Sequence, residues 1–130
     1  MISPQDRDFN TVFNLDASHP DSVKSDQAVK FDGGKTQWGL FPWDAAEEVV
    51  KVLQFGAGKY SPWNWAEGEG FKFSRLFNSS MRHFVAWFWR KEDNDPETGL
   101  SHLAHLSCNV LFLLHYVLNK NNFNKNDDRR

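Results

Sequence analysis

Apolar side chains recur with helical spacing in three separate segments of the chain. These segments cover residues 42 to 55, 74 to 91 and 100 to 118. In each, apolar positions return every three or four residues, which places them on one face of a helix. The apolar stripe of the middle segment consists of Phe77, Met81, Phe84 and Phe88. No stretch alternates polar and apolar residues as a strand does, so the sequence predicts an all-α fold, a small bundle of three main helices.

Local signals indicate where these helices begin and end. Gly56 and Gly58 are expected to close the first helix, because glycine is common just after the last helical residue. Ser74 is a good N-cap for the second helix. Ser101 or Thr98 can cap the third.

The third segment differs from the others because a polar row runs along it. At ~100° per residue, His102, His105 and Asn109 fall within an arc of about 60°. Val110 and Leu114 point the other way. Such a row costs desolvation free energy, which a chain tolerates more readily when the row binds something. The two histidines can ligate a metal or donate to phosphate oxygens; alternatively, they line a polar seam between packed helices.

The two ends of the chain lack this periodicity. Residues 1 to 36 are polar and irregular and end in a glycine turn, so we expect an N-terminal arm there. Residues 119 to 130 are rich in Asn, Lys and Asp, and we expect a flexible tail. Residues 37 to 118 then form the helical domain.

Composition narrows the class of protein. An aromatic content of 15% excludes wholesale disorder and exceeds what so small a helical subunit can bury. We therefore expect a homo-oligomer, a dimer or larger, with Trp89 and neighbouring residues of the second helix at the interface. A net charge of −2 provides no basic footprint for DNA or RNA.

The cellular compartment can be inferred from two further features. The single Cys108 cannot form an internal disulfide, which favours a reducing compartment such as the cytoplasm. No apolar run reaches ~18 residues and the N-terminus is polar, so neither a membrane span nor a signal peptide is expected. We thus predict a cytoplasmic protein with no membrane partner.

Acidic side chains gather between the second and third helices. Glu92 and Asp95 are oxygen ligands of the kind that Mg²⁺ or Mn²⁺ prefers, although the same residues can form an exposed acidic turn. Glu48 in the first helix either joins such a site or pairs with Lys51. His83, at the edge of the second helix's apolar stripe, is either a ligand or a hydrogen-bonded residue beside the core.

The loop after the first helix contains the parts of a nucleobase pocket. Tyr60 and Trp65 offer stacking faces, Asn64 an amide that reads a base edge, and Lys59 a cation. The alternative is a loop packed by its own aromatic side chains.

Two arginines share the polar face of the second helix. In a nucleotide site, Arg75 and Arg82 would clamp phosphates, because guanidinium meets phosphate bidentately; otherwise they are solvated. No P-loop, G-x-G-x-x-G or H-E-x-x-H pattern is present in the sequence.

Short motifs between residues 31 and 118 form a distinctive combination. They are Phe55-Gly56-Ala57-x-Lys59-Tyr60, Asn64-Trp65, Ser74-Arg75, Arg82-His83, Glu92-Asp93-x-Asp95-Pro96-Glu97-x-Gly99-Leu100 and His102-Leu103-Ala104-His105. With these motifs the chain resembles the phage-associated dATP/dGTP diphosphohydrolases, near the MazG-like all-α nucleotide pyrophosphatases. The resemblance implies Mg²⁺- or Mn²⁺-dependent cleavage of a purine deoxynucleoside triphosphate to the monophosphate and pyrophosphate.

The resemblance also implies roles for individual residues. MazG-like enzymes share the motifs E-x-x-E and, later, E-x-x-D; the second fits Glu92-x-x-Asp95, whereas the first retains Glu48 but has Ala45 at its other position. The implied metal ligands are Glu48, Glu92 and Asp95. The implied catalytic residues are Glu48, His83, His102 and His105, the histidines completing the shell. The implied substrate-binding residues are Lys59, Tyr60, Asn64, Trp65, Arg75, Arg82 and Asn109.

Two other classes of function stay open at this point. A non-catalytic, sponge-like phage protein would hold a nucleotide in the same pocket without hydrolysing it. A purely structural helical module would not be stabilised by nucleotides at all. Metal-dependent hydrolysis distinguishes the enzyme from the sponge.

Overall fold

The computed structural model describes residues 28 to 130 and divides the chain into two units. The first unit comprises Met1–Phe41, and its described part contains a short 3₁₀ helix, η2 (Trp38–Leu40). The second unit comprises Pro42–Arg130. Most of the predicted N-terminal arm, residues 1 to 27, lies outside the described residues.

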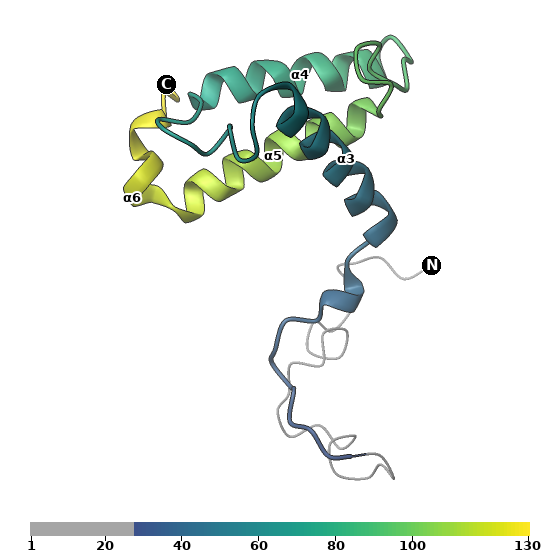
Figure 1. The fold of residues 1–130 in the computed structure, drawn as a ribbon, viewed down its shortest axis with the longest axis vertical. Helices are drawn as coiled ribbons and strands as arrows, with labels where there is room; N and C mark the ends of the chain where they lie inside the picture. Colours follow the sequence, from purple (N-terminus) through teal and green to yellow (C-terminus); the bar gives the residue numbers. More distant parts are fainter. Residues whose placement is uncertain (1–27) are drawn as a thin grey trace. The chain divides into compact units, whose positions relative to one another are not determined.

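The second unit is built of helices, which confirms the all-α prediction. Its elements are α3 (Trp43–Lys59), α4 (Phe73–Phe88), α5 (His102–Leu118), α6 (Lys120–Phe123) and the 3₁₀ helix η3 (Asn124–Asn126). α4 and α5 form an antiparallel hairpin, and α3 packs against α5 (Figure 1). Residues 28–130 contain no strand, only an isolated bridge between Asn94 and Ser101. No helix in this part of the chain has the length and apolarity needed to cross a membrane.

Several helix ends differ from the prediction; for example, α4 ends at Phe88, three residues before the predicted end. α3 continues through Gly56 and Gly58, because neither glycine takes the left-handed conformation that would end the helix. α4 begins one residue before Ser74, which is therefore not its N-cap. The backbone N–H and hydroxyl of Ser74 instead donate to the carboxylate of Asp128. The predicted cap of α5 is confirmed, because the Ser101 hydroxyl accepts a backbone N–H from the first turn.

The buried core lies where α4 begins and α5 ends. It consists of Phe73, Leu76, Tyr116 and Phe123. Tyr116 is 1% exposed; its hydroxyl donates to the carbonyl of Trp65 and accepts the N–H of Phe71. The core thereby holds the loop between α3 and α4 in place.

The C-terminal segment belongs to this core, so the predicted flexible tail over residues 119 to 130 is wrong. Phe123 is 6% exposed, and its ring centroid lies 4.6 Å from that of Tyr116. Asn126 is also buried and donates its side-chain N–H groups to two carbonyls of the loop before α4. One aromatic anchor and one amide that pairs buried carbonyls outweigh the polar composition around them.

Gly70 is required where the tail meets that loop. Its φ is +65°, and a Cβ there would lie 3.1 Å from the Tyr116 hydroxyl and 3.2 Å from Nδ2 of Asn126. Glycine alone combines this backbone conformation with so close an approach of two side chains.

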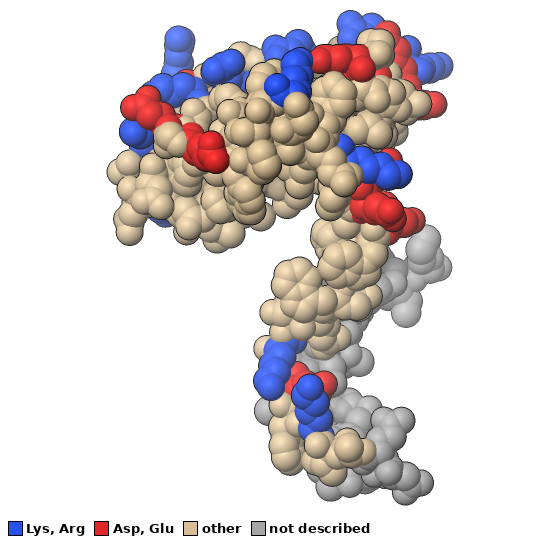
Figure 2. Space-filling model, viewed as in Figure 1, with Lys and Arg blue, Asp and Glu red and all other residues tan. Residues whose placement is uncertain are grey.

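The hairpin of α4 and α5 has a broad apolar surface that the subunit itself does not cover. The predicted stripe of α4 is exposed, from 41% at Met81 to 68% at Phe88. On α5, Val110 and Leu114 are also about half exposed. We call this surface the outer face; it consists of Phe77, Met81, Phe84, Phe88, Val110, Leu114 and Val117. By contrast, many charged side chains of the second unit lie along α4, at the top of the view in Figure 2.

Candidate functional site

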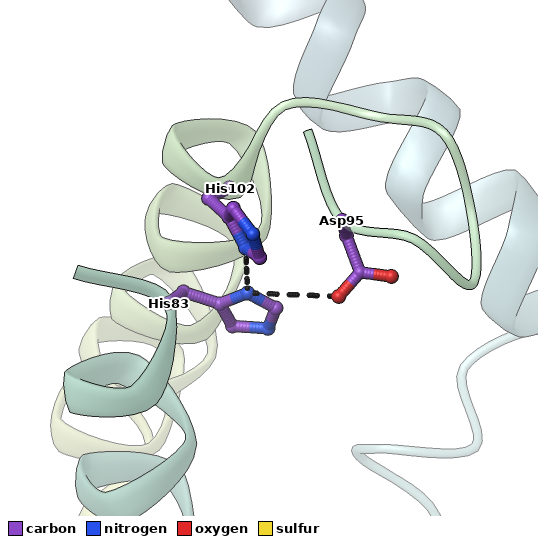
Figure 3. Close-up of side chains that lie close together, drawn as sticks. All are labelled: His83, Asp95 and His102. Carbon is purple, nitrogen blue, oxygen red and sulfur yellow. Dashed lines mark hydrogen bonds and ion pairs between the residues drawn. The ribbon is translucent and has the colours of Figure 1, made fainter. Parts of the chain in front are cut away.

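Three potential metal ligands converge near the end of the hairpin opposite the core. His83 comes from α4, Asp95 from the connecting turn, and His102 is the first residue of α5 (Figure 3). Nδ1 of His83 lies 2.9 Å from Nδ1 of His102 and 4.0 Å from Oδ2 of Asp95. Within residues 28–130, this is the one group of three or more such side chains whose ligand atoms all lie within 4.8 Å of one another.

The turn between α4 and α5 directs Asp95 toward the histidines. Oδ1 of Asp95 accepts the N–H groups of Glu97 and Thr98 at 2.9 and 3.1 Å. Gly99, with a φ of +72°, donates its N–H to the Asp95 carbonyl at 2.7 Å. An aspartate that binds the backbone just ahead of it stabilises a turn. The local sequence thus fixes the carboxylate and leaves Oδ2 on the side of His83.

His105 adds another imidazole to the group. Its ring stacks on that of His83, with the centroids 4.6 Å apart and the planes within 6°. Its Nε2 lies 2.7 Å from Oγ1 of Thr98. Sequence reasoning considered Thr98 only as a helix cap and missed this contact. The one feature of the sequence that could have indicated this contact is that Thr98 follows Asp95, which forms the turn, by three residues.

Burial keeps His83 and His105 neutral, while the carboxylate of Asp95 stays charged. Burial, together with the neighbouring His105 and His102, lowers the pKa of His83 to about 4. Burial also lowers the pKa of His105. For Asp95, burial raises the pKa, but the two N–H groups of the turn outweigh it and hold the pKa below its usual value. Neutral imidazoles and an ionised carboxylate are the forms that bind a cation.

His102 is the most deeply buried member of the group. It is 4% exposed, and its Nε2 is a buried atom with no hydrogen-bond partner. The nearest acidic group is Glu92, whose Oε2 lies 3.6 Å from that nitrogen. The backbone N–H of His102 donates to the carbonyl of Asp93, which ties the start of α5 to the turn.

A cavity of about 450 Å³ opens beside the histidines. It is bounded by α3, α4, α5 and the loop after α3, and His83 and His105 form part of its wall. The predicted substrate-binding residues that line it are Tyr60, Asn64, Trp65 and Asn109. Trp63, another aromatic residue of the same loop, lines it as well.

Comparison with known proteins identifies the family. Residues 25–127 match the family described as dATP/dGTP diphosphohydrolase, N-terminal. The chain belongs to this family. A dATP/dGTP diphosphohydrolase of Salmonella phage PMBT28 is 38% identical over 102 residues. The match covers 78% of this chain but 33% of the phage protein, so the chain spans about a third of that relative's length. No solved structure matches.

In this member of the family, two aromatic rings of the cavity already contact each other. Trp65 stacks on Phe112 with the centroids 4.2 Å apart, and its centroid lies 5.3 Å from that of Trp63. Trp63 is 62% exposed. Trp63 therefore offers the more open ring to a ligand.

Polar and sulfur groups complete the cavity wall. Asn109 donates its side-chain N–H to Oγ of Ser79 at 3.1 Å. Cys108 is buried, and burial raises the pKa of its thiol to about 12. The thiol is thus an unreactive packing group rather than a nucleophile.

Two of the predicted site residues pair with other charged groups. Glu48 forms an ion pair with Lys51 at 2.7 Å along the surface of α3. Lys59 pairs with Glu97 at 2.7 Å, which connects the end of α3 to the turn that carries Asp95.

The two predicted phosphate-binding arginines stay exposed on α4. Arg75 lies over the ring of Phe71, with its guanidinium carbon 5.2 Å from the ring centroid. Arg82 is the neighbour of His83 in the chain, and its charge contributes to the lowered pKa of that histidine.

Proposed function

We propose that this chain is the catalytic domain of a divalent-metal-dependent hydrolase. Its substrate is a purine deoxynucleoside triphosphate, dATP or dGTP, and its products are the monophosphate and pyrophosphate. The observation that carries the proposal is the position of the histidine cluster. The imidazoles of His83 and His105 form part of the wall of a cavity lined by indole and amide side chains, and the carboxylate of Asp95 lies 4.0 Å from His83. The family and the phage relative support the same substrates.

The cavity suits a nucleobase. Its volume of about 450 Å³ lies in the range of pockets that enclose small ligands. The Trp63 ring provides a stacking surface, as aromatic side chains do for bases in general. The amides of Asn64 and Asn109 can read polar groups on a base or sugar.

The residues of the turn suit the phosphates. A bound Mg²⁺ or Mn²⁺ would neutralise the triphosphate and lower the pKa of a bound water. Asp95 offers an oxygen ligand for it, and the carboxylate of Glu92 lies next to His102, 3.6 Å from its Nε2. Lys59, held at the turn by Glu97, provides positive charge for the phosphate oxygens. His105, kept neutral by burial, can take the proton of the attacking water.

The outer face supports assembly into a homo-oligomer. The cavity and α3 lie on the side of the hairpin marked by Ser79 on α4 and Phe112 on α5. At ~100° per residue, the residues of the outer face point to the opposite side of both helices. A second copy seated there would bury both stripes and pair the two hairpins into a four-helix arrangement.

The decisive test is to incubate the protein with each deoxynucleoside triphosphate and Mn²⁺ and to identify the products by anion-exchange chromatography. We expect dAMP or dGMP with pyrophosphate, and no reaction after chelation. Nucleoside with inorganic triphosphate would contradict the proposed point of cleavage. Unchanged nucleotide that remains tightly bound would support a sponge instead.

Two variants assign the reaction to the site. His105→Gln should reduce turnover, whereas Ser107→Ala, an exposed position on the same helix whose hydroxyl bonds only a carbonyl of α5, should leave it unchanged. Glu48→Gln is nearly isosteric and should stay folded, so it tests whether Glu48, which pairs with Lys51 on α3, also takes part in the reaction; loss of turnover would include it. Full activity of Glu48→Gln would remove Glu48 from the site.

A further inference from the structure

The geometry of the cluster points to a more specific metal site than the carboxylates alone suggest. In a site with metal–nitrogen and metal–oxygen distances of ~2.0–2.2 Å, neighbouring ligand atoms lie about 3 Å apart. The two Nδ1 atoms of His83 and His102 are 2.9 Å apart. Oδ2 of Asp95 lies 4.0 Å from Nδ1 of His83, and the ligand atoms of all three residues lie within 4.8 Å of one another.

The surroundings of His102 favour the tautomer that binds a metal. If its Nδ1 carried the proton, the lone pair of its buried Nε2 would face the Glu92 carboxylate 3.6 Å away. If Nε2 carries the proton instead, the N–H faces the carboxylate and the Nδ1 lone pair faces His83. A carboxylate behind a metal-bound histidine fixes its ring and raises its basicity in this way. Glu92 is thus placed as an outer-shell partner.

The chemistry of the donors selects the ion. Mg²⁺ prefers an all-oxygen shell that includes several waters, whereas imidazole suits Mn²⁺, Fe²⁺, Co²⁺, Ni²⁺ and Zn²⁺. We infer that His83, His102 and Asp95 together bind one first-row transition-metal ion, with the carboxylate of Glu92 placed behind His102, 3.6 Å from its Nε2. Three protein ligands leave coordination positions open for water or a phosphate oxygen.

This assignment rests on the proposed function for the role of the ion, but not for its binding. Ion binding requires no nucleotide. The remaining imidazole, His105, bonds Thr98 through Nε2 and is not among the three ligands. A variant of His105 should therefore lower turnover without changing metal binding.

The test uses the full chain without a histidine tag, freed of metal by a chelator. Co²⁺ is titrated in and its visible absorption bands are recorded, and calorimetric titrations compare Mn²⁺, Zn²⁺ and Mg²⁺. We expect Co²⁺ bands of a nitrogen–oxygen site with one ion per chain, and weaker binding of Mg²⁺ than of Mn²⁺ or Zn²⁺. Equal affinity for Mg²⁺ and Mn²⁺, or no Co²⁺ bands, would overturn the inference.

Variants locate the ion. His83→Gln and Asp95→Asn should each lower Co²⁺ affinity by more than the ~10- to 100-fold loss typical of an outer-shell change, which is what we expect for Glu92→Gln. His105→Gln, the matched histidine control, should retain the bands. Circular dichroism checks that each variant is folded. If a variant of a metal ligand does not fold, the affinity of Glu92→Gln for Co²⁺ still tests the site. Unchanged affinity in both His83→Gln and Glu92→Gln contradicts the site, whereas Co²⁺ binding without hydrolysis of any nucleotide contradicts only the proposed reaction.

Discussion

Replacing Phe123 by alanine should destabilise the helical unit strongly. The side chain is 6% exposed, and its ring centroid lies 4.6 Å from that of Tyr116 and 5.9 Å from that of His115. Removing a buried phenyl ring loses its transfer free energy and leaves a cavity, at a cost of about 3–5 kcal/mol. That is a large share of the ~5–15 kcal/mol that keeps a domain folded.

Urea denaturation followed by far-ultraviolet circular dichroism measures this loss. All proteins are compared at one concentration, because self-association adds to apparent stability. Phe123→Leu keeps part of the buried volume and should fall between wild type and Phe123→Ala. Asn121→Ala is the matched control: it lies in the same short helix but is exposed, so its free energy of unfolding should change by no more than ~0.5 kcal/mol.

The same substitution has a functional consequence. Phe123 and Tyr116 share the core that fixes the loop lining the cavity, so Phe123→Ala should also weaken nucleotide binding where the protein remains folded. Identical unfolding midpoints for wild type and Phe123→Ala would refute the reasoning, because a tail that does not pack cannot lose contacts.

Three further outcomes follow from the structure. Tyr116→Phe removes the hydroxyl that pairs two backbone groups of the loop, so unfolding free energy should fall by about 1–3 kcal/mol in the same denaturation assay. Cys108, with its pKa raised to about 12, should react with a thiol reagent at neutral pH only after unfolding, and the native rate should rise as the pH increases toward that pKa. Val110→Asp places a charge on the outer face and should yield a monomer by light scattering; an oligomer of unchanged mass would contradict the proposed interface.

The helices were predictable because each has a sustained period of apolar residues. The sequence did not reveal which apolar side is covered within the subunit, because α4 is apolar on two sides. Its regular stripe, with Phe84 and Phe88, is exposed, whereas the less regular set with Phe73 and Leu76 is buried. Choosing between two apolar sides depends on how the helices pack, which periodicity does not encode.

The site was predictable in part for a related reason. His102 and His105 belong to one helix, so their spacing alone placed them side by side. The contact of His83 with His102 depends on the register between α4 and α5, which the turn sets through Asp95 and Gly99. The buried tail had no signal of this kind, because a single Phe123 among polar residues has no period.

The two opposite sides of α5 have a mechanical consequence. The polar row of this helix turns inward to the histidine cluster, and its apolar row turns outward. A helix of 17 residues is a stiff rod of about 25 Å. Because its close-packed side chains transmit strain, pressure on one side of the rod displaces the other side too. A molecule bound to the outer side of α5 would therefore change the distance between His102 on α5 and His83 on α4 without contacting either ring.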